Sequence, residues 1–275
     1  MPTLPLPLPL HGRVALVTGA NHGIGAATAV ALADLGADVA VSFLRIRSVA
    51  DPGRPPEYDV ARQQGADEVR AGIEAAGVRS HVVEADLSDP DAPRRMFDDV
   101  EQALGPVAIL INNASGWRKD TFLPTEPDRF GRANEGVTAA TFDAQFLVDA
   151  RAGALLIAEL ARRHLERGAD WGRIVSMTSG GPAGFPGEAS YGAAKAALDN
   201  YTMTASIELA AAGITANVVH PPVTDTGWIT DDVRRFVAES DDHVHVSAPA
   251  EVAEVIAWLC TDAARLVTGN LVRLR

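Results

Sequence analysis

Short, continuous apolar runs alternate with longer Ala-rich segments along most of this chain of 275 residues. The apolar runs predict strands at residues 14–18, 37–43, 80–84, 107–112, 173–178 and 215–219. The segments between them predict helices at residues 24–35, 69–76, 93–104, 148–167 and 191–212. Strands that are apolar on both faces and alternate with helices are typical of a parallel sheet. The pattern therefore predicts an α/β fold, a doubly wound parallel sheet with helices on both faces.

Three segments depart from this alternation. Residues 1–11 alternate Pro and Leu, so we expect a flexible N-terminal arm before a single domain over residues 12–275. Residues 46–64 and 116–137 are long and polar, and we expect them to be inserted loops. Each follows the carboxyl end of a predicted strand, the edge at which open α/β sheets bind ligands. We therefore expect both insertions beside substrate or cofactor.

Charge and cysteine content narrow the classes of partner. The net charge of −12 at pH 7 argues against nucleic acid or an anionic membrane surface as the main partner. No apolar run is long enough to span a bilayer, and the N-terminus lacks the basic start of a signal peptide. The single cysteine, Cys260, excludes an internal disulfide and fits a cytoplasmic location. No two histidines have the helical spacing of metal ligands, so we expect no metal.

A glycine-rich turn, TGANHGIG, joins the first predicted strand to the first predicted helix at residues 18–25. Glycines let a backbone turn tightly and approach a ligand closely, and a helix start offers N–H groups to a phosphate. The spacing Gly-x-x-x-Gly-x-Gly differs from the better-known dinucleotide fingerprint. Because a strand precedes the turn and a helix follows it, we expect a Rossmann-type nucleotide site rather than a plain turn. The residues expected to contact the cofactor here are Gly19, Asn21, His22, Gly23, Ile24 and Gly25.

The end of the second predicted strand bears on the choice between NAD and NADP. An NAD site usually places an acidic residue there, on the ribose hydroxyls. This strand is followed by Arg45 instead, and Asp38 lies at its other end. An arginine can pair with the 2′-phosphate that distinguishes NADP, and Arg47 and Arg54 follow in the same segment. We therefore expect NADP(H) in preference to NAD(H), the alternative being that Arg45 is a solvated loop residue.

Tyr191 and Lys195 lie four residues apart in a helical run of small residues, so they share one helix face. Two unit charges about 4 Å apart, at an effective dielectric of about 20, attract each other by about 4 kcal/mol. That attraction is enough to lower the pKa of a phenol from about 10 by up to about 3 units. We therefore expect Tyr191 to exchange a proton near neutral pH. Tyr and Lys at this spacing are common, and an exposed pair is the alternative.

With the glycine turn and this Tyr–Lys pair in one chain, the sequence resembles the short-chain dehydrogenase/reductase family from about residue 12 to about residue 269. Further segments resemble family motifs in the expected order. These are Asp86-Leu87, Asn112-Asn113-Ala114-Ser115, the strand from Gly172 to Ser179, and the segment from Pro221 to Thr226. The resemblance implies further cofactor contacts from Asp86, Leu87, Asn113, Ala114, Tyr191, Lys195, Pro221, Thr224 and Thr226.

The resemblance also implies hydride transfer between the nicotinamide and a carbonyl or secondary alcohol. Tyr191 would be the general acid in reduction and the base in oxidation, and Lys195 would lower its pKa and bind the nicotinamide ribose. Ser179 would hydrogen-bond the substrate oxygen and stabilise developing charge. Counting from Gly172 puts the catalytic serine at Ser179, whereas the commoner spacing before Tyr191 puts it at Thr178. We favour Ser179, with one residue deleted from the loop between.

Three features depart from the family's pattern. Asp149 stands where many members have an asparagine that holds a water linking the lysine to solvent, and carboxylate oxygens can also hold a water. We expect Asp149 to act in this relay as a catalytic residue, the alternative being a helix-packing acid. Pro222 replaces a glycine, which makes the nicotinamide turn more rigid. The final residues lack the family's usual Gly-Gly, which often packs at a subunit interface, but the resemblance still implies a homo-oligomer, a tetramer or a dimer.

The resemblance implies a small-molecule carbonyl or alcohol substrate without identifying it. We expect substrate contacts from two segments and a mobile lid: Trp117 and Phe122, residues 180–188, and residues 226–247 with Trp228 and Phe236. The most similar subgroups are 3-oxoacyl-carrier-protein reductases and pteridine-reductase-like members. Two alternatives remain, a non-catalytic NADP-binding sensor and an epimerase or dehalogenase on the same scaffold. Retention of Ser179, Tyr191 and Lys195 argues against the sensor.

Overall fold

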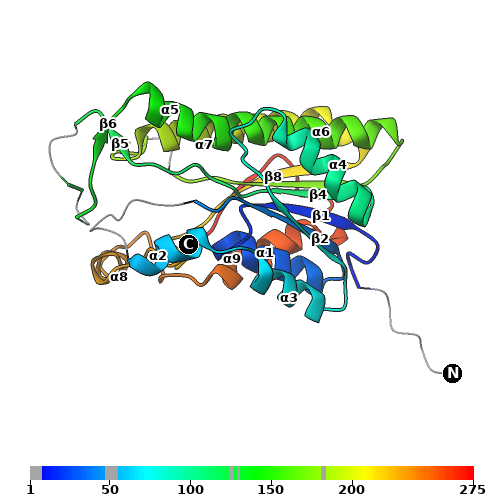
Figure 1. Cartoon of the computed structure of the whole chain (residues 1–275), viewed down its shortest axis with the longest axis horizontal. Helices are drawn as coiled ribbons and strands as arrows, with labels where there is room; N and C mark the ends of the chain where they lie inside the picture. Colours follow the sequence, from blue (N-terminus) through cyan, green and yellow to red (C-terminus); the bar gives the residue numbers. More distant parts are fainter. Residues whose placement is uncertain (1–7, 47–54, 124–126, 129–130, 181–183) are drawn as a thin grey trace.

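The computed structural model describes residues 8–46, 55–123, 127–128, 131–180 and 184–275. In these ranges the central sheet has seven parallel strands, in the order β3-β2-β1-β4-β7-β8-β9 (Figure 1). The strands are β1 (Val14–Thr18), β2 (Asp38–Phe43), β3 (Ser80–Glu84), β4 (Val107–Asn112), β7 (Gly172–Met177), β8 (Ile214–His220) and β9 (Leu271–Arg273). The strand order reverses between β1 and β4, and doubly wound sheets bind ligands in the crevice at such a point.

Helices cover both faces of this sheet, as predicted (Figure 1). One face carries α1 (Gly23–Asp34), α3 (Asp67–Ala75) and α9 (Pro249–Leu259). The other face carries α4 (Ala92–Leu104), α6 (Gly153–Glu166) and α7 (Ala189–Glu208). None of the helices in the described ranges is both long and apolar enough to cross a membrane.

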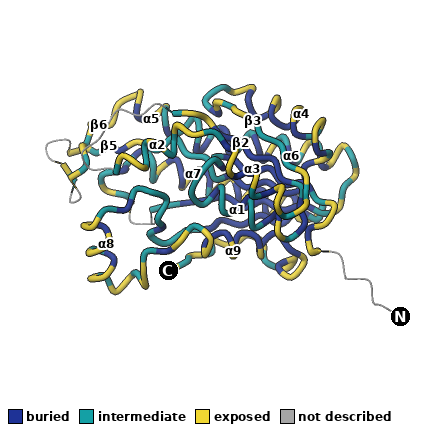
Figure 2. The backbone as a smooth tube through the Cα atoms, turned by 60° about the horizontal axis from the view of Figure 1, so that its bottom comes forward, coloured by how far each residue is buried: buried dark blue, intermediate teal, exposed yellow. Residues whose placement is uncertain are grey.

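The five inner strands of the sheet are buried between these two helix layers, whereas the edge strands β3 and β9 are partly exposed (Figure 2). In β1, Ala15 and Val17 belong to an apolar cluster with Leu32 of α1, whereas Val14 and Leu16 belong to a second cluster on the other face. Successive side chains of a strand point to opposite faces, so a continuous apolar run serves both layers. For this reason all six predicted strands are present with nearly the predicted bounds.

The sequence pattern missed α9, which buries five residues, and β9, the seventh strand of the sheet. The other elements that it missed are short or bury few residues. α2 (Pro56–Gln63) has no buried residue and lies in the expected loop 46–64, so that expectation is wrong for the second half of the loop. α8 (Asp231–Ala238) lies in the expected lid and buries only Val233 and Val237. The remaining missed elements are β5 (Asp120–Thr121) and β6 (Glu135–Gly136) in the segment 116–137, α5 (Ala139–Gln145) and a 3₁₀ turn at Asp262–Ala264. The predicted helix 148–167 begins as a π-helical turn (Phe146–Ala152), and the predicted helix 191–212 ends in a 3₁₀ turn (Ala210–Ala212).

The end of the expected N-terminal arm belongs to the packed structure. Leu10 is fully buried, and its backbone N–H donates to the carbonyl of Leu35 at 2.8 Å. Gly36 lies so close to Leu8 that a Cβ atom there would come within 2.8 Å of the Leu8 Cβ. A flexible arm over residues 1–11 is therefore wrong from Leu8 onward, and residues 1–7 lie outside the described residues.

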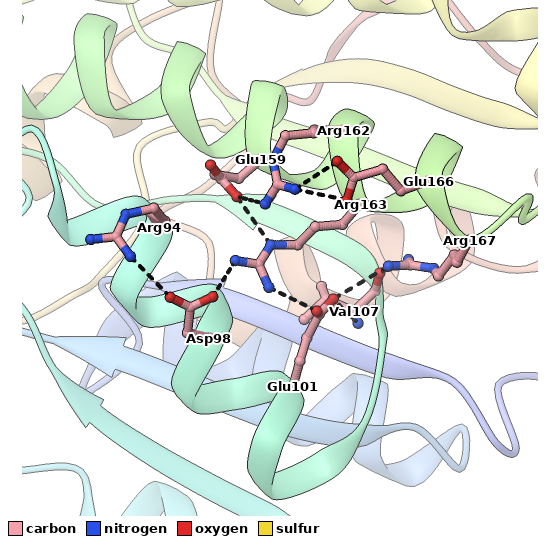
Figure 3. A network of polar contacts seen from close by, with 9 residues as sticks. All are labelled: Arg94, Asp98, Glu101, Val107, Glu159, Arg162, Arg163, Glu166 and Arg167. Carbon is pink, nitrogen blue, oxygen red and sulfur yellow. Dashed lines mark hydrogen bonds and ion pairs between the residues drawn. The ribbon is translucent and has the colours of Figure 1, made fainter.

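A charge network fastens α4 to α6 (Figure 3). The Arg163 side chain, only 12% exposed, pairs with Asp98 and Glu101 of α4 and with Glu159 of its own helix. Burial alone would lower the pKa of Arg163, but hydrogen bonds to these carboxylates outweigh burial and raise it. Glu101 also accepts the backbone N–H of Val107 at the amino end of β4. The network therefore lies at the end of the sheet opposite the crevice, where it stabilises the fold.

Candidate active site

The turn between β1 and α1 requires glycine at three positions. Gly19 and Gly23 have φ angles of +61° and +59°, a left-handed conformation that favours glycine. A Cβ atom on Gly19 would lie 2.7 Å from the Cα of Ala114. A Cβ atom on Gly25 would lie 2.5 Å from the side-chain nitrogen of Asn113. The turn therefore lies directly against the segment that follows β4.

Asn113 holds this turn in place. Its side-chain amide donates to the backbone carbonyls of Thr18 and Gly19, each at 2.9 Å. The Thr18 hydroxyl in turn accepts the backbone N–H groups of Asn113 and Ala114, at 3.0 and 3.1 Å. Asn113 therefore holds the glycine turn against the end of β4, which is a structural role in addition to the expected contact with a cofactor.

A cleft opens at the carboxyl ends of β1, β2 and β4, where the strand order reverses. The expected cofactor contacts that line it are Gly19, Asn21, His22, Gly23, Ile24, Asp86, Leu87, Asn113, Ala114 and Thr226. Gly23 and Ile24 are also the first residues of α1, so a phosphate in the cleft would lie at a helix N-terminus. A glycine cradle that any side chain would fill, beside a helix start, fits a dinucleotide. Of the other expected contacts, the lining does not include Gly25, Arg45, Tyr191, Lys195, Pro221 or Thr224.

α2 packs against the glycine turn and extends the wall of the cleft. The side-chain amide of Asn21 donates to the carbonyl of Gln64, just after α2, at 3.1 Å. The His22 ring meets the Tyr58 ring edge-on, with ring centroids 6.3 Å apart. Tyr58 and Arg62 both line the cleft. Sequence reasoning missed these two residues because α2 has no buried apolar face that would have predicted a helix. Their spacing of four residues, which puts them on one face of a helix, was the signal that could have found them.

Arg45 lies beside the cleft without lining it. Its guanidinium forms an ion pair with Glu84, at the end of β3, and lies over the Phe43 ring with its central carbon 5.1 Å from the ring centroid. The structure thus places the arginine that was expected to bind the 2′-phosphate on a neighbouring carboxylate. Arg47 and Arg54, the other two candidates, lie outside the described residues.

Arg62 supplies positive charge to this part of the cleft. Its guanidinium carbon lies 5.7 Å from the centroid of the Tyr58 ring. Burial lowers the pKa of His22, and the charge of Arg62 lowers it further. His22 is therefore neutral near pH 7, and Arg62 is the cation that an anionic group would meet beside the glycine turn.

The segment expected to hold the nicotinamide contributes Thr226 to the lining of the cleft. Thr224 is buried, and its hydroxyl donates to the carbonyl of Pro222 at 2.9 Å. A Cβ atom on Gly23 would lie 3.0 Å from the side chain of Thr226, so this segment closes directly over the glycine turn. Pro222 and Thr224 therefore shape the turn that presents Thr226.

Ser179 and Tyr191 meet just beyond the carboxyl end of β7. The Ser179 side chain is near enough to the Tyr191 hydroxyl to lower its pKa, although burial outweighs this effect. Thr178, the alternative position for the catalytic serine, instead donates its hydroxyl to Asp199 of α7 at 2.9 Å. The geometry therefore agrees with Ser179, and not Thr178, as the partner of Tyr191.

Lys195 and Asp149 form a fully buried ion pair. The Lys195 Nζ lies 2.9 Å from one carboxylate oxygen of Asp149, and the two side chains are 2% and 0% exposed. The other oxygen accepts the backbone N–H of Gly116 at 2.9 Å. Asp149 lies in the π-helical turn Phe146–Ala152, and such widened turns are frequent at functional sites. Asp149 thus contacts the ammonium directly, where the expected relay would place a water between them.

Burial decides the acidity of Tyr191. Burial is the largest cause, and it raises the pKa of Tyr191 to about 12. The negative charges of Asp149 and Glu188 raise this pKa further, whereas the charge of Lys195 and the nearby Ser179 side chain lower it. Burial by itself would lower the pKa of Lys195, but the Asp149 carboxylate outweighs burial and raises it. Lys195 is therefore charged. The expectation that Lys195 brings the pKa of Tyr191 toward neutrality is wrong for this structure.

Of the four aromatic residues expected to contact substrate, one lines the cleft and three do not. Trp117 lines the cleft. Phe122 is 82% exposed, and Phe236 packs against the ring of His243 with centroids 5.7 Å apart. Residues 181–183 of the expected contact segment lie outside the described residues. Among the residues that the structure does describe, no three His, Cys, Asp or Glu side chains are grouped to hold a metal ion.

Comparison with known proteins identifies the family of the chain. Residues 58–273 match the family model described as enoyl-(acyl carrier protein) reductase. The chain is 34% identical over 273 residues to the "NADPH-dependent aldehyde reductase-like protein, chloroplastic" of Arabidopsis thaliana. This match covers 97% of this chain and 94% of the Arabidopsis protein.

Solved structures of reductases have the same fold. The promiscuous reductase LugOII, which catalyses keto-reduction at C1 during lugdunomycin biosynthesis, has a TM-score of 0.77 and 32% identity, covering 96% of this chain and 97% of LugOII. A blue fluorescent protein from a metagenomic library, in complex with NADPH, has a TM-score of 0.77 and 30% identity, covering 97% of each chain. Because the similarity extends over nearly the whole chain, this protein belongs to the short-chain dehydrogenase/reductase family and is an oxidoreductase.

Proposed function

We propose that this protein is an NADP(H)-dependent oxidoreductase that interconverts a small-molecule carbonyl and a secondary alcohol, with Tyr191 as general acid and base. The observation that carries the proposal is the group formed by the half-buried Ser179 and Tyr191 and the buried Lys195, near a cleft that fits a dinucleotide. The nicotinamide cofactor would supply or accept the hydride when bound. The keto-reduction by LugOII and the NADPH in the name of the Arabidopsis relative support this reaction class. A homo-oligomeric state and a cytoplasmic location stay predictions.

The Tyr191 hydroxyl suits the role of proton donor. A phenol with a pKa of about 12 keeps its proton at neutral pH and can donate it to a carbonyl oxygen that becomes negative. The Ser179 hydroxyl, beside it, is a second donor to the same oxygen. Lys195, held charged by Asp149, stabilises the phenolate that proton transfer leaves behind. These roles favour carbonyl reduction at neutral pH, because oxidation requires the phenolate as base.

The preference for NADP(H) is supported by α2. The cleft wall at the end of β2 consists of Ser42, Phe43 and Leu44, which offer no carboxylate to the ribose hydroxyls. Arg62 lines the same cleft, whereas Arg45 is occupied by an ion pair at the end of β3. We therefore assign recognition of the 2′-phosphate mainly to Arg62 and give Arg45 a smaller part.

A panel of aldehydes, ketones and secondary alcohols, assayed through NADPH absorbance, tests the proposed reaction. We expect turnover of at least one compound, and we expect Tyr191→Phe to lower kcat by at least about 100-fold because it removes the proton donor and keeps the ring. NADPH binding by this variant should persist. Tight NADPH binding by the unmodified protein without turnover of any compound would instead identify a non-catalytic sensor.

Substitution of the two arginines separates their roles in cofactor choice. We expect Arg62→Leu to raise the KM for NADPH by about tenfold or more, since a hydrogen bond to a charged group is lost, and to leave the KM for NADH nearly unchanged. Arg45→Leu should change the NADPH-to-NADH ratio much less. If Arg45→Leu abolishes the preference and Arg62→Leu does not, the assignment to Arg62 is wrong. A preference of the unmodified protein for NADH would contradict the NADP(H) proposal itself.

Asp149→Asn tests the influence of the buried carboxylate on Tyr191. The substitution removes a negative charge that raises the pKa of Tyr191, so this pKa should fall. We expect partial activity to remain, and we expect the rise of alcohol oxidation with pH to shift to lower pH by about one unit or more. Rates of oxidation measured from pH 6 to 11 provide the profile. Asp149→Asn and Asp149→Ala profiles that both coincide with the unmodified enzyme would show that Asp149 only packs.

A further inference from the structure

Arg132 connects the insertion after β4 to the catalytic helix. Its guanidinium pairs with Asp128 at 2.8 Å and with Glu188 at 3.4 Å, and its side chain is 12% exposed. Glu188 lies immediately before α7, three residues before Tyr191, and its own side chain is 11% exposed. Arg132 therefore contacts a residue that lies within one helical turn of Tyr191 along the chain.

Two indole rings flank the same guanidinium. The Arg132 central carbon lies 5.8 Å from the centroid of Trp117 and 5.9 Å from that of Trp228, distances at which a cation is attracted to an indole. The Trp117 N–H donates to Glu188 at 2.9 Å, and the Trp228 N–H donates to the carbonyl of Thr224 at 3.1 Å. The orientation of both rings is therefore fixed by hydrogen bonds as well as by Arg132.

Trp228 belongs to the segment that closes over the glycine turn through Thr226. It lies two residues after Thr226, which lines the cofactor cleft, and directly before α8. α8 is mostly exposed and buries only two residues (Figure 2). In Figure 1, α8 and the β5–β6 region lie at the same end of the molecule. The contact between Arg132 and Trp228 thus joins segments that are close to 100 residues apart in sequence.

The surrounding charges keep Arg132 in this place. Lys119, only 5% exposed, pairs with Asp128 at 2.7 Å and hydrogen-bonds Asn134 at 2.9 Å. Burial would raise the pKa of Asp128, but hydrogen bonds from Lys119 and Arg132 outweigh it, and the pKa is lowered to about 2. Among the described residues, the cations Lys119 and Arg132 and the carboxylates Asp128 and Glu188 therefore form one group that is largely shielded from water.

We infer that Arg132 is a positioning residue that holds the segment around Trp228 closed over the catalytic end of α7, and thereby sets the affinity for the carbonyl substrate. This inference rests on the proposed function for its effect on catalysis. A planar guanidinium can contact two ring faces and two carboxylates at once, whereas a lysine ammonium is a point charge without such faces. If Arg132 merely compensates the charges of Asp128 and Glu188, the Arg132→Lys variant will keep the KM of the unmodified enzyme. If Arg132 also joins the two indoles, this variant will have a higher KM.

Kinetics of Arg132→Lys and Arg132→Met, beside a matched control, distinguish these roles. Arg118→Met changes an exposed arginine of the same insertion, 58% exposed and 3.7 Å from Glu135, and should behave like the unmodified enzyme. We expect both Arg132 variants to raise the KM for a carbonyl substrate by about five- to tenfold, with kcat and the Kd for NADPH changed by less than about threefold. In combination with Trp228→Leu, Arg132→Lys should add little further increase in KM, because both substitutions break the same contact.

Hydrogen exchange of peptides from residues 226–247 gives a readout that needs no substrate. We expect exchange in this segment to become at least about fivefold faster in both Arg132 variants and to stay unchanged in Arg118→Met. Restoration of KM and exchange by Arg132→Lys, or additive effects with Trp228→Leu, would overturn the inference. If the unmodified protein turns over no carbonyl, the proposed function fails, and exchange alone still decides whether Arg132 closes this segment.

Discussion

Lys195 carries its charge where water does not reach, and the arrangement of the active site depends on how that charge is balanced. A buried ammonium without a partner would lose its proton or destabilise the fold. The Asp149 carboxylate, 2.9 Å away, removes this cost, and the backbone N–H of Gly116 fixes its second oxygen. A Cβ atom on Gly116 would lie 2.0 Å from the carbonyl oxygen of Ala144, so the close approach depends on glycine. The widened helical turn therefore holds Asp149 where its carboxylate can pair with Lys195.

The same ion pair limits what Lys195 does for Tyr191. An ammonium alone would stabilise the phenolate, but the adjacent carboxylate cancels much of its field, and burial then favours the neutral phenol. Glu188 adds a second negative charge nearby. Tyr191 accordingly stays protonated at neutral pH, the state that a proton donor to a carbonyl oxygen requires, whereas a base toward an alcohol requires the phenolate. Reduction is thus the direction that the electrostatics favour at neutral pH.

The sequence predicts those features that depend on burial patterns and fixed spacings. Continuous apolar runs predict strands buried on both faces, and the glycine turn follows from local spacing. The choice of Ser179 came from the family resemblance, because the commoner spacing before Tyr191 pointed to Thr178. α2 could not be predicted, because it buries no residue and its contribution, Arg62, depends on how it packs against the glycine turn. The direction of the pKa shift at Tyr191 was also beyond the sequence, because it is the sum of burial and charges contributed by separate elements. The two polar insertions looked like loops, yet one supplies a wall of the cofactor cleft and the other supplies Arg132.

The acidity of Tyr191 in the folded protein tests this account most directly. The chain has three tyrosines, so ¹³C labelling at the ζ-carbon gives few signals, and Tyr191→Phe identifies the one that matters. With its pKa raised to about 12, the Tyr191 signal should show no sign of ionisation up to about pH 10.5. A Tyr191 signal that titrates below about pH 9 would contradict the account, because Lys195 would then dominate over burial and Asp149.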